Sequence, residues 1–220
     1  MNNSEILKHV DHTLLKAFAT WEAIQVICDE AVEYKCASVC IPACYISRIH
    51  EKYKELNICT VVGFPLGYSS TEGKIAETKK ALQDGANEID MVINITHVKN
   101  KMYDEVTAEI RALKEVVKDK ILKVIIETCY LTEEEKIKVC KCVTNAGADY
   151  IKTSTGFGTG GATIEDVELF KKHIGKDVKI KAAGGVSTVD DLKMFIDAGC
   201  DRIGTSRAVG LLKGETTSGY

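Results

Sequence analysis

Three features of the sequence predict an α/β fold, a single (β/α)8 TIM barrel. Short runs rich in β-branched and apolar residues alternate with segments of helical periodicity along the whole chain, a pattern typical of a parallel sheet with crossover helices. Eight such strand-like runs occur. The length of 220 residues is also close to the roughly 250 residues that one such barrel commonly occupies.

The elements follow in order along the chain. We expect strands at residues 9–14, 37–41, 58–63, 88–93, 122–127, 149–153, 178–182 and 202–205. The segment after Thr20 is expected to form an amphipathic helix, because its apolar residues recur with helical spacing. These residues, at i, i+3, i+4 and i+7, are Ile24, Ile27, Cys28 and Ala31.

Local signals for helix starts and stops support this phasing. Four expected helix starts carry a capping-box pattern, in which Ser or Thr precedes an acidic residue by three positions. The pairs are Ser69 with Glu72, Thr132 with Glu135, Thr163 with Asp166, and Ser187 with Asp190. A short repeat of helix stop followed by strand places Gly85, Gly147 and Gly199 where a left-handed residue ends a helix.

The chain reads as one domain over residues 1–220. No linker, low-complexity segment or change of composition interrupts it before the last nine residues. The tail 212–220 is polar, contains two glycines and ends in Tyr220, so we expect it to be mobile.

Composition narrows the class of function. With 45% hydrophobic and 28% charged residues, the chain is expected to be globular rather than disordered. A net charge of -3 offers no global field to attract nucleic acid or an anionic membrane. The N-terminus lacks an apolar run of signal-peptide length, and no segment approaches about 18 uninterrupted apolar residues, so we expect a cytoplasmic protein.

Nine cysteines and five histidines form no recognisable metal motif. The cysteines are odd in number and make no paired C-x-x-C knuckles, and Cys36, Cys40 and Cys44 straddle an expected strand. We expect free thiols that pack as small hydrophobic groups, and no bound metal.

Two lysines near strand ends are candidates for covalent chemistry. Lys152 could be an ordinary lysine with its ammonium in water, or a nucleophile that points into the barrel mouth. In the seventh expected strand, Lys179 and Lys181 share one face. We favour Lys181, because it lies nearer the carboxyl end of the strand, where the active sites of such barrels lie.

Proximity of these lysines would change their acid–base behaviour. If the sixth and seventh strands are neighbours, Lys152 and Lys181 face a shared pocket, and we expect one of the two pKa values to fall. A neutral lysine amine attacks carbonyl groups to form a Schiff base. Asp90, in the fourth expected strand, is a third ionisable group, interpreted either as a carboxylate tethered to a cation or as part of a proton relay.

Glycine-rich segments suggest where an anion binds. Gly184 and Gly185 end the seventh expected strand, and the run from Gly204 to Arg207, which includes Ser206, ends the eighth and opens a helix. The loops after strands seven and eight form the common phosphate site of such barrels, although a Gly-Gly pair also occurs in ordinary tight turns. The loop 153–161 has four glycines and is flexible enough to close on a ligand.

Five motifs together resemble those of the deoxyribose-phosphate aldolases, a family of class I aldolases on a (β/α)8 barrel. They occur in the family's order and cover nearly the whole chain. The motifs are DHTLLK at 11–16, GFPLG at 63–67, EIDMV at 88–92, YIKTSTGF at 150–157 and IKAAGGV at 180–186.

The resemblance implies the reversible aldol cleavage of 2-deoxy-D-ribose 5-phosphate to D-glyceraldehyde 3-phosphate and acetaldehyde, in deoxyribose phosphate catabolism, without metal or organic cofactor. Lys152 would form the imine, Lys181 would lower the pKa of Lys152 and transfer protons, and Asp90 would shuttle protons through a bound water. Four further residues match phosphate-side positions of the family: Gly156, Gly184, Gly185 and Ser206. Tyr220 matches a C-terminal tyrosine that reaches the site in some members, and Asp11 is a possible site residue.

The sequence also departs from the family pattern. Ala17 replaces a usual proline, Ser187 stands where an arginine is common, and Arg207 replaces a small residue. Arg207 would either restore a positive charge near the phosphate or fold outward. Two alternative functions are a barrel isomerase or epimerase of a phosphorylated sugar and a non-catalytic sugar-phosphate-binding barrel. Barrels of this size often associate, so a homo-oligomer is possible.

Overall fold

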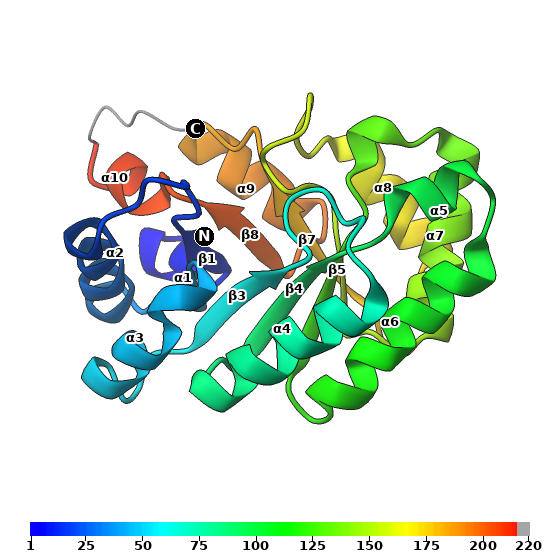
Figure 1. Ribbon diagram of the computed structural model, residues 1–220. Helices are drawn as coiled ribbons and strands as arrows, with labels where there is room; N and C mark the ends of the chain where they lie inside the picture. The colour runs from blue at the N-terminus through cyan, green and yellow to red at the C-terminus, as the bar shows by residue number, and fades with distance from the viewer. Residues whose placement is uncertain (215–220) are drawn as a thin grey trace.

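A closed barrel of eight parallel strands forms the centre of the computed structural model, which describes residues 1–214 (Figure 1). The strands follow one another around the barrel in chain order, and β1 pairs with β8 to close it. They are β1 (Val10–Thr13), β2 (Ser38–Cys40), β3 (Ile58–Val62), β4 (Glu88–Val92), β5 (Ile121–Ile125), β6 (Tyr150–Lys152), β7 (Lys179–Ala183) and β8 (Arg202–Thr205). The predicted fold class is confirmed.

Helices surround this barrel and cover its outer face (Figure 1). The α-helices are α1 (Asn3–Leu7), α2 (Trp21–Glu33), α3 (Ile46–Lys52), α4 (Thr71–Asp84), α5 (Ile95–Lys99), α6 (Tyr103–Val117), α7 (Glu133–Asn145), α8 (Ile164–His173), α9 (Val189–Asp197) and α10 (Ala208–Leu212). Two 3-10 turns, η1 (Ala43–Tyr45) and η2 (Thr128–Tyr130), lie in loops. Within residues 1–214, no helix is long and apolar enough to cross a membrane.

Two of the four predicted helix starts are wrong by one residue. The N-cap of α4 is Ser70 rather than Ser69, and that of α9 is Thr188 rather than Ser187. In each case two hydroxyl residues are adjacent, and it is the hydroxyl of the second one that accepts a hydrogen bond from the backbone N–H of the residue three positions later in the chain. This bond satisfies one of the N–H groups that have no partner within the first turn of the helix. The other two N-caps are as predicted: Thr132 and Thr163. The glycines expected after helices do adopt positive φ: Gly85, Gly147 and Gly199.

The strand register separates apolar and charged side chains onto opposite faces of the barrel wall. Alternation along each strand sends one set of residues outward, where they pack under the helices. This outward set includes Ile89, Met91, Val124, Ile151, Ile180 and Ile203. Across the strands, Asp90 lies opposite Lys123 and Lys152 lies opposite Lys181. These charged residues occupy the positions that alternate with the outward apolar residues, so their side chains point into the barrel.

A buried ion pair outside the barrel fixes the carboxyl end of β4. Lys74 of α4 lies 2.7 Å from the Glu109 carboxylate of α6, the helix beside it (Figure 1), and also donates to the Val92 carbonyl at 2.8 Å. The second Glu109 oxygen accepts the Asn94 backbone N–H at 3.1 Å. Burial lowers the pKa of Lys74, and Glu109 opposes that shift. The pair thus ties the end of the strand that carries Asp90 to two helices.

Candidate active site

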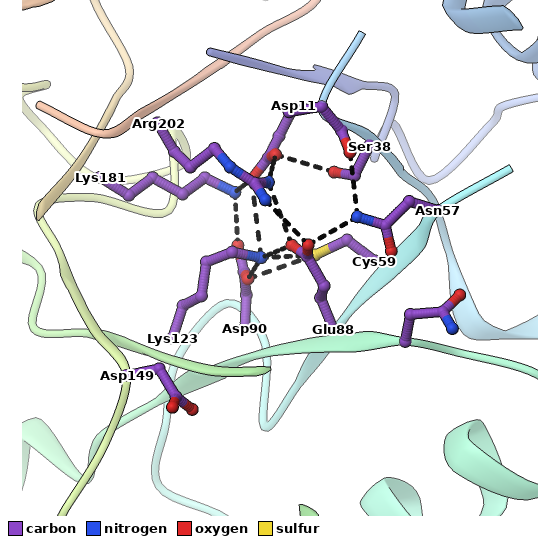
Figure 2. A network of polar contacts seen from close by, with 12 residues as sticks. Asp11, Ser38, Asn57, Cys59, Glu88, Asp90, Lys123, Asp149, Lys181 and Arg202 are labelled. Carbon is purple, nitrogen blue, oxygen red and sulfur yellow. Dashed lines mark hydrogen bonds and ion pairs between the residues drawn. The ribbon is translucent and has the colours of Figure 1, made fainter. Parts of the chain in front are cut away.

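The Asp90 carboxylate is the centre of a charged network inside the barrel (Figure 2). One oxygen, Oδ2, accepts hydrogen bonds from Lys152 Nζ at 2.8 Å and from Lys181 Nζ at 2.7 Å. The other oxygen, Oδ1, accepts from Lys123 Nζ at 2.9 Å and from the Cys59 thiol at 3.2 Å. Three ammonium groups therefore share one fully buried carboxylate.

Lys152 is the last residue of β6, and its side chain is buried. Only 3% of the residue is exposed, and its ammonium is paired with Asp90 rather than hydrated. Lys152 also contributes to the wall of the cavity at the barrel mouth. The interpretation of Lys152 as an ordinary surface lysine is therefore wrong.

The two lysines of β7 have different surroundings. Lys181 is fully buried and contacts Asp11 Oδ2 at 2.5 Å as well as Asp90. Lys179 is exposed, at the start of the strand, and its ammonium lies 5.8 Å from the centre of the Tyr150 ring. Of the two, only Lys181 belongs to the network around Asp90.

Carboxylates offset the repulsion that we expected between the two lysines. Burial alone would lower the pKa of Lys181, but Asp11 and Asp90 outweigh it and raise this pKa well above the usual lysine range. Burial would likewise raise the pKa of Asp90, yet Lys123, Lys152 and Lys181 together hold it well below the usual range. The pKa of Lys181 is thus raised rather than lowered, because its ammonium contacts both Asp11 and Asp90.

Several members of the network were missed by the sequence reasoning. Lys123 bridges Asp90 to Glu88 Oε2, which lies 2.5 Å from its Nζ. Arg202 then connects Glu88 to Asp11, with contacts of 3.0 Å and 2.5 Å (Figure 2). A usable signal was present, because these charges occupy alternate positions of strands that are otherwise apolar.

A cavity of about 270 Å³ opens at the carboxyl end of the strands, above the network. It brings Lys152 together with segments that are far apart in the sequence, the loops after β6, β7 and β8. The predicted phosphate-side residues all line it, and so do two of the positions that depart from the family pattern. These residues are Gly156, Gly184, Gly185, Ser206, Ser187 and Arg207. Ala17 is an exposed loop residue, and Tyr220 lies outside the described residues.

The cysteines are all free thiols, as predicted. Cys40 and Cys59 come together with Asp90, their ligand atoms within 4.8 Å of one another, a grouping that could hold a metal ion. The Lys123 ammonium, however, is 3.4 Å from the Cys59 sulfur and 2.9 Å from Asp90. A cation here would meet strong repulsion from the lysines, so the donor set fits a metal poorly.

The low pKa values of Asp11 and Asp90 make folding stability depend on pH. Burial alone would raise the pKa of Asp11, but Lys181, Lys123 and Arg202 outweigh it and hold this pKa far below its usual range. Such a carboxyl contributes stability above the unfolded pKa, about 3.9, and this is lost as pH falls towards the folded value.

We therefore predict that the free energy of unfolding, measured with urea, falls steeply between about pH 4 and pH 2.5. Asp11→Asn should flatten this dependence and cost about 3–5 kcal/mol at pH 6, because it leaves buried cations unpaired. The exposed Asp177→Asn is the matched control. Equal slopes for the wild type and Asp11→Asn would contradict the prediction.

Comparison with known proteins agrees with this geometry. The model of the DeoC/LacD family aldolases matches residues 6–217. The chain is 81% identical to a protein of Clostridium botulinum (strain Alaska E43 / Type E3) named deoxyribose-phosphate aldolase, with both chains covered in full. A protein of the same name from Clostridioides difficile (strain 630) is 57% identical, over 98% of this chain and 99% of that one.

A solved structure extends the likeness to the whole fold. The tetrameric deoxyribose phosphate aldolase from Aeropyrum pernix superimposes with a TM-score of 0.87 at 29% identity, covering 97% of this chain and 92% of that chain. The resemblance of the five sequence motifs is thus confirmed over the whole barrel, and the chain belongs to the DeoC/LacD family of aldolases.

Proposed function

We propose that the protein catalyses the reversible aldol cleavage of 2-deoxy-D-ribose 5-phosphate to D-glyceraldehyde 3-phosphate and acetaldehyde, in deoxyribose phosphate catabolism. The observation that carries this proposal is the buried Lys152, which lines the cavity and lies within hydrogen-bond distance of Asp90. The names of the similar aldolases support the substrate. Neither the isomerase nor the non-catalytic alternative accounts for two lysines that share one carboxylate.

In the proposed mechanism, the Lys152 amine attacks the aldehyde carbon of the open-chain sugar, and loss of water gives an imine. The C3 hydroxyl then loses its proton, the C2–C3 bond breaks, and D-glyceraldehyde 3-phosphate leaves. The electron pair of that bond moves into the imine and forms an enamine. Protonation of the enamine at C2, followed by hydrolysis, releases acetaldehyde and regenerates the Lys152 amine.

The neighbours of Lys152 have distinct proposed roles. Asp90 Oδ2, 2.8 Å from Lys152 Nζ, accepts and returns the protons that imine formation and hydrolysis require. Lys181 contacts the same oxygen and keeps its own proton, because Asp11 and Asp90 raise its pKa. Its ammonium donates a hydrogen bond to Asp90 at 2.7 Å, which holds that carboxylate in place beside Lys152.

Proposed phosphate binding uses cavity residues of the loops after β6, β7 and β8. The backbone around Gly156, Gly184 and Gly185 and the Ser206 hydroxyl offer donors to a phosphate. We propose that Arg207 supplies the positive charge, since it lines the cavity beside Ser206, whereas Ser187 brings no charge from the loop after β7.

Three further properties of the chain are proposed. We propose a single domain over residues 1–220, a homo-oligomer like the tetrameric aldolase of Aeropyrum pernix, and a cytoplasmic location. Tyr220 lies outside the described residues, and its part in the site stays a prediction of the family resemblance. Leu212, placed by the sequence in a mobile tail, is the last residue of α10.

Covalent trapping tests the proposed nucleophile. We predict that sodium borohydride in the presence of acetaldehyde reduces the imine and leaves an ethyl adduct on Lys152, detected by intact mass and peptide mapping. Lys152→Met should show no adduct at this site and no aldol cleavage. An adduct confined to other lysines, with Lys152 unmodified, would disprove the assignment.

Comparison of the two lysines on β7 tests the role of Lys181. We predict that Lys181→Leu lowers kcat for cleavage by about 100-fold or more, because it removes a charge and a proton donor beside Asp90. Lys179→Leu, on the same strand but outside the network, is the matched control and should stay within about twofold of wild type. Thermal unfolding verifies that both variants fold. Similar losses in the two variants would count against the role of Lys181.

Removal of the Arg207 guanidinium tests its proposed contact with phosphate. Arg207→Ala should raise KM for 2-deoxy-D-ribose 5-phosphate by about tenfold, since a charged hydrogen bond contributes roughly 1.5 kcal/mol. The KM for unphosphorylated 2-deoxy-D-ribose should stay constant. Lys176→Ala, at an exposed lysine in the loop before β7, is the control. An unchanged KM for the phosphorylated sugar would mean that Arg207 makes no phosphate contact.

A further inference from the structure

Glu127 has an unusual backbone conformation for a buried residue. It lies two residues after the end of β5, and its φ of 52° is in the left-handed region, which disfavours residues with a side chain. Three other non-glycine residues of the described chain share a positive φ, and all are exposed lysines: Lys35, Lys101 and Lys118. Glu127 is only 1% exposed. Such an outlier beside an active site indicates a functional constraint.

The carboxylate of Glu127 adds a second unfavourable feature. Burial raises the pKa of Glu127 above its usual value, although hydrogen bonds from Thr155 and the charge of Lys152 oppose that shift. A raised carboxyl pKa means that the folded state favours the protonated form, so stability is lost as the pH rises from the unfolded pKa through the folded pKa. Neither the backbone nor the charge of this residue is explained by stability alone.

Thr155 is the residue that Glu127 holds. Its hydroxyl donates to Glu127 Oε2 in a short hydrogen bond, and its backbone N–H lies 3.2 Å from Oε1 and 3.3 Å from Oε2. The same hydroxyl accepts the Phe157 N–H at 3.0 Å. Glu127 therefore fixes both the side chain and the backbone at the start of the glycine-rich segment 155–161, which we call the cavity loop.

The far end of the cavity loop is fixed to a different strand. Ala162 N–H donates to the carbonyls of Ala183 and Gly184, each at 3.1 Å. A Cβ on Gly161 would lie 2.5 Å from the Gly184 backbone, so the two loops are in close backbone contact. Between the two anchors, a Cβ on Gly158 would come within 3.1 Å of the Glu127 carboxylate carbon.

The cavity loop forms one wall of the cavity that Lys152 lines. Six of its residues contribute to that wall: Thr155, Gly156, Gly158, Thr159, Gly160 and Gly161. The glycines give the loop little resistance of its own to movement. Its position then depends on these two anchors and on the edge-to-face contact between the Phe157 and Phe64 rings, whose centres are 5.3 Å apart. Of these contacts, the Glu127 anchor is the one made by a buried carboxyl group.

We propose that Glu127 is a positioning residue, which clamps Thr155 and so holds the cavity loop in the place that phosphorylated substrate requires. This inference rests on the proposed function of the cavity and of Lys152. Glu127 itself contacts neither reacting atoms nor phosphate. Loss of the clamp lets the loop move, which weakens binding of the phosphorylated sugar and leaves the chemistry at Lys152 unchanged.

Variants on both sides of the contact test this clamp. Thr155→Val removes the hydroxyl while nearly keeping the shape, Glu127→Ala removes the carboxylate, and Thr155→Ser is the matched control that keeps the hydroxyl. We expect the first two to raise KM for 2-deoxy-D-ribose 5-phosphate about tenfold with kcat within threefold of wild type. Thr155→Ser should stay within twofold in both constants.

Two further measurements separate the clamp from other roles. The double variant Glu127→Ala with Thr155→Val should have a KM for 2-deoxy-D-ribose 5-phosphate within twofold of the higher of the two single-variant values. Both changes break the same interaction, so their effects should not multiply. The rate at which borohydride traps acetaldehyde on Lys152 should stay within twofold in every variant, because acetaldehyde carries no phosphate. Glu127→Leu takes the place of Glu127→Ala in both measurements if the alanine variant does not fold, because leucine fills the space but accepts no hydrogen bond.

Defined outcomes overturn the proposal. One is a lower thermal midpoint with unchanged KM in Thr155→Val, which would make the contact merely structural. Multiplicative losses in the double variant would show independent roles, and a parallel fall in acetaldehyde trapping would show that Glu127 acts through the charge of Lys152. Failure of wild-type protein to be trapped at Lys152 would instead contradict the proposed function, so the two failures are distinguishable.

Discussion

Attraction between one buried carboxylate and three lysine ammonium groups is the interaction on which the site depends. Asp90 binds Lys123, Lys152 and Lys181 inside a barrel whose interior is usually filled by branched apolar side chains. Charges buried in this way are tolerated only when they are paired and hydrogen-bonded. The proposed nucleophile is therefore held at a fixed place and beside a proton acceptor before any substrate arrives.

Closure of the barrel completes this pairing. Arg202 in β8 reaches Asp11 in β1, 191 residues away in the chain, because those two strands are neighbours in the closed sheet. The same arginine reaches Glu88, which connects the first and last strands to β4. Outside the barrel, Lys74 and Glu109 tie the end of β4 to two helices. Strand order, rather than local sequence, thus determines which charges meet.

The fold and the three proposed catalytic residues could be predicted from the sequence, because strand periodicity and chain order are local signals. Asp90, Lys152 and Lys181 were identified because each interrupts an apolar strand near its carboxyl end. Lys123 and Arg202 were missed although they interrupt otherwise apolar strands, because the carboxylates that pair with them lie on other strands and meet them only in the closed barrel. The opposing pKa effects on Lys181 depend on the position of Asp90 between two ammonium groups, which requires three-dimensional geometry.

The ionic interior has a consequence for how such a sequence can change over time. Seven charged side chains share this space, four positive and three negative: Lys123, Lys152, Lys181, Arg202, Asp11, Glu88 and Asp90. Replacement of one of the three acidic residues by a neutral residue leaves buried cations with too few partners, whereas an apolar interior accepts one change at a time. Viable substitutions inside this barrel should therefore arise in charge-balanced groups, which makes the interior much slower to diversify than the helices around it.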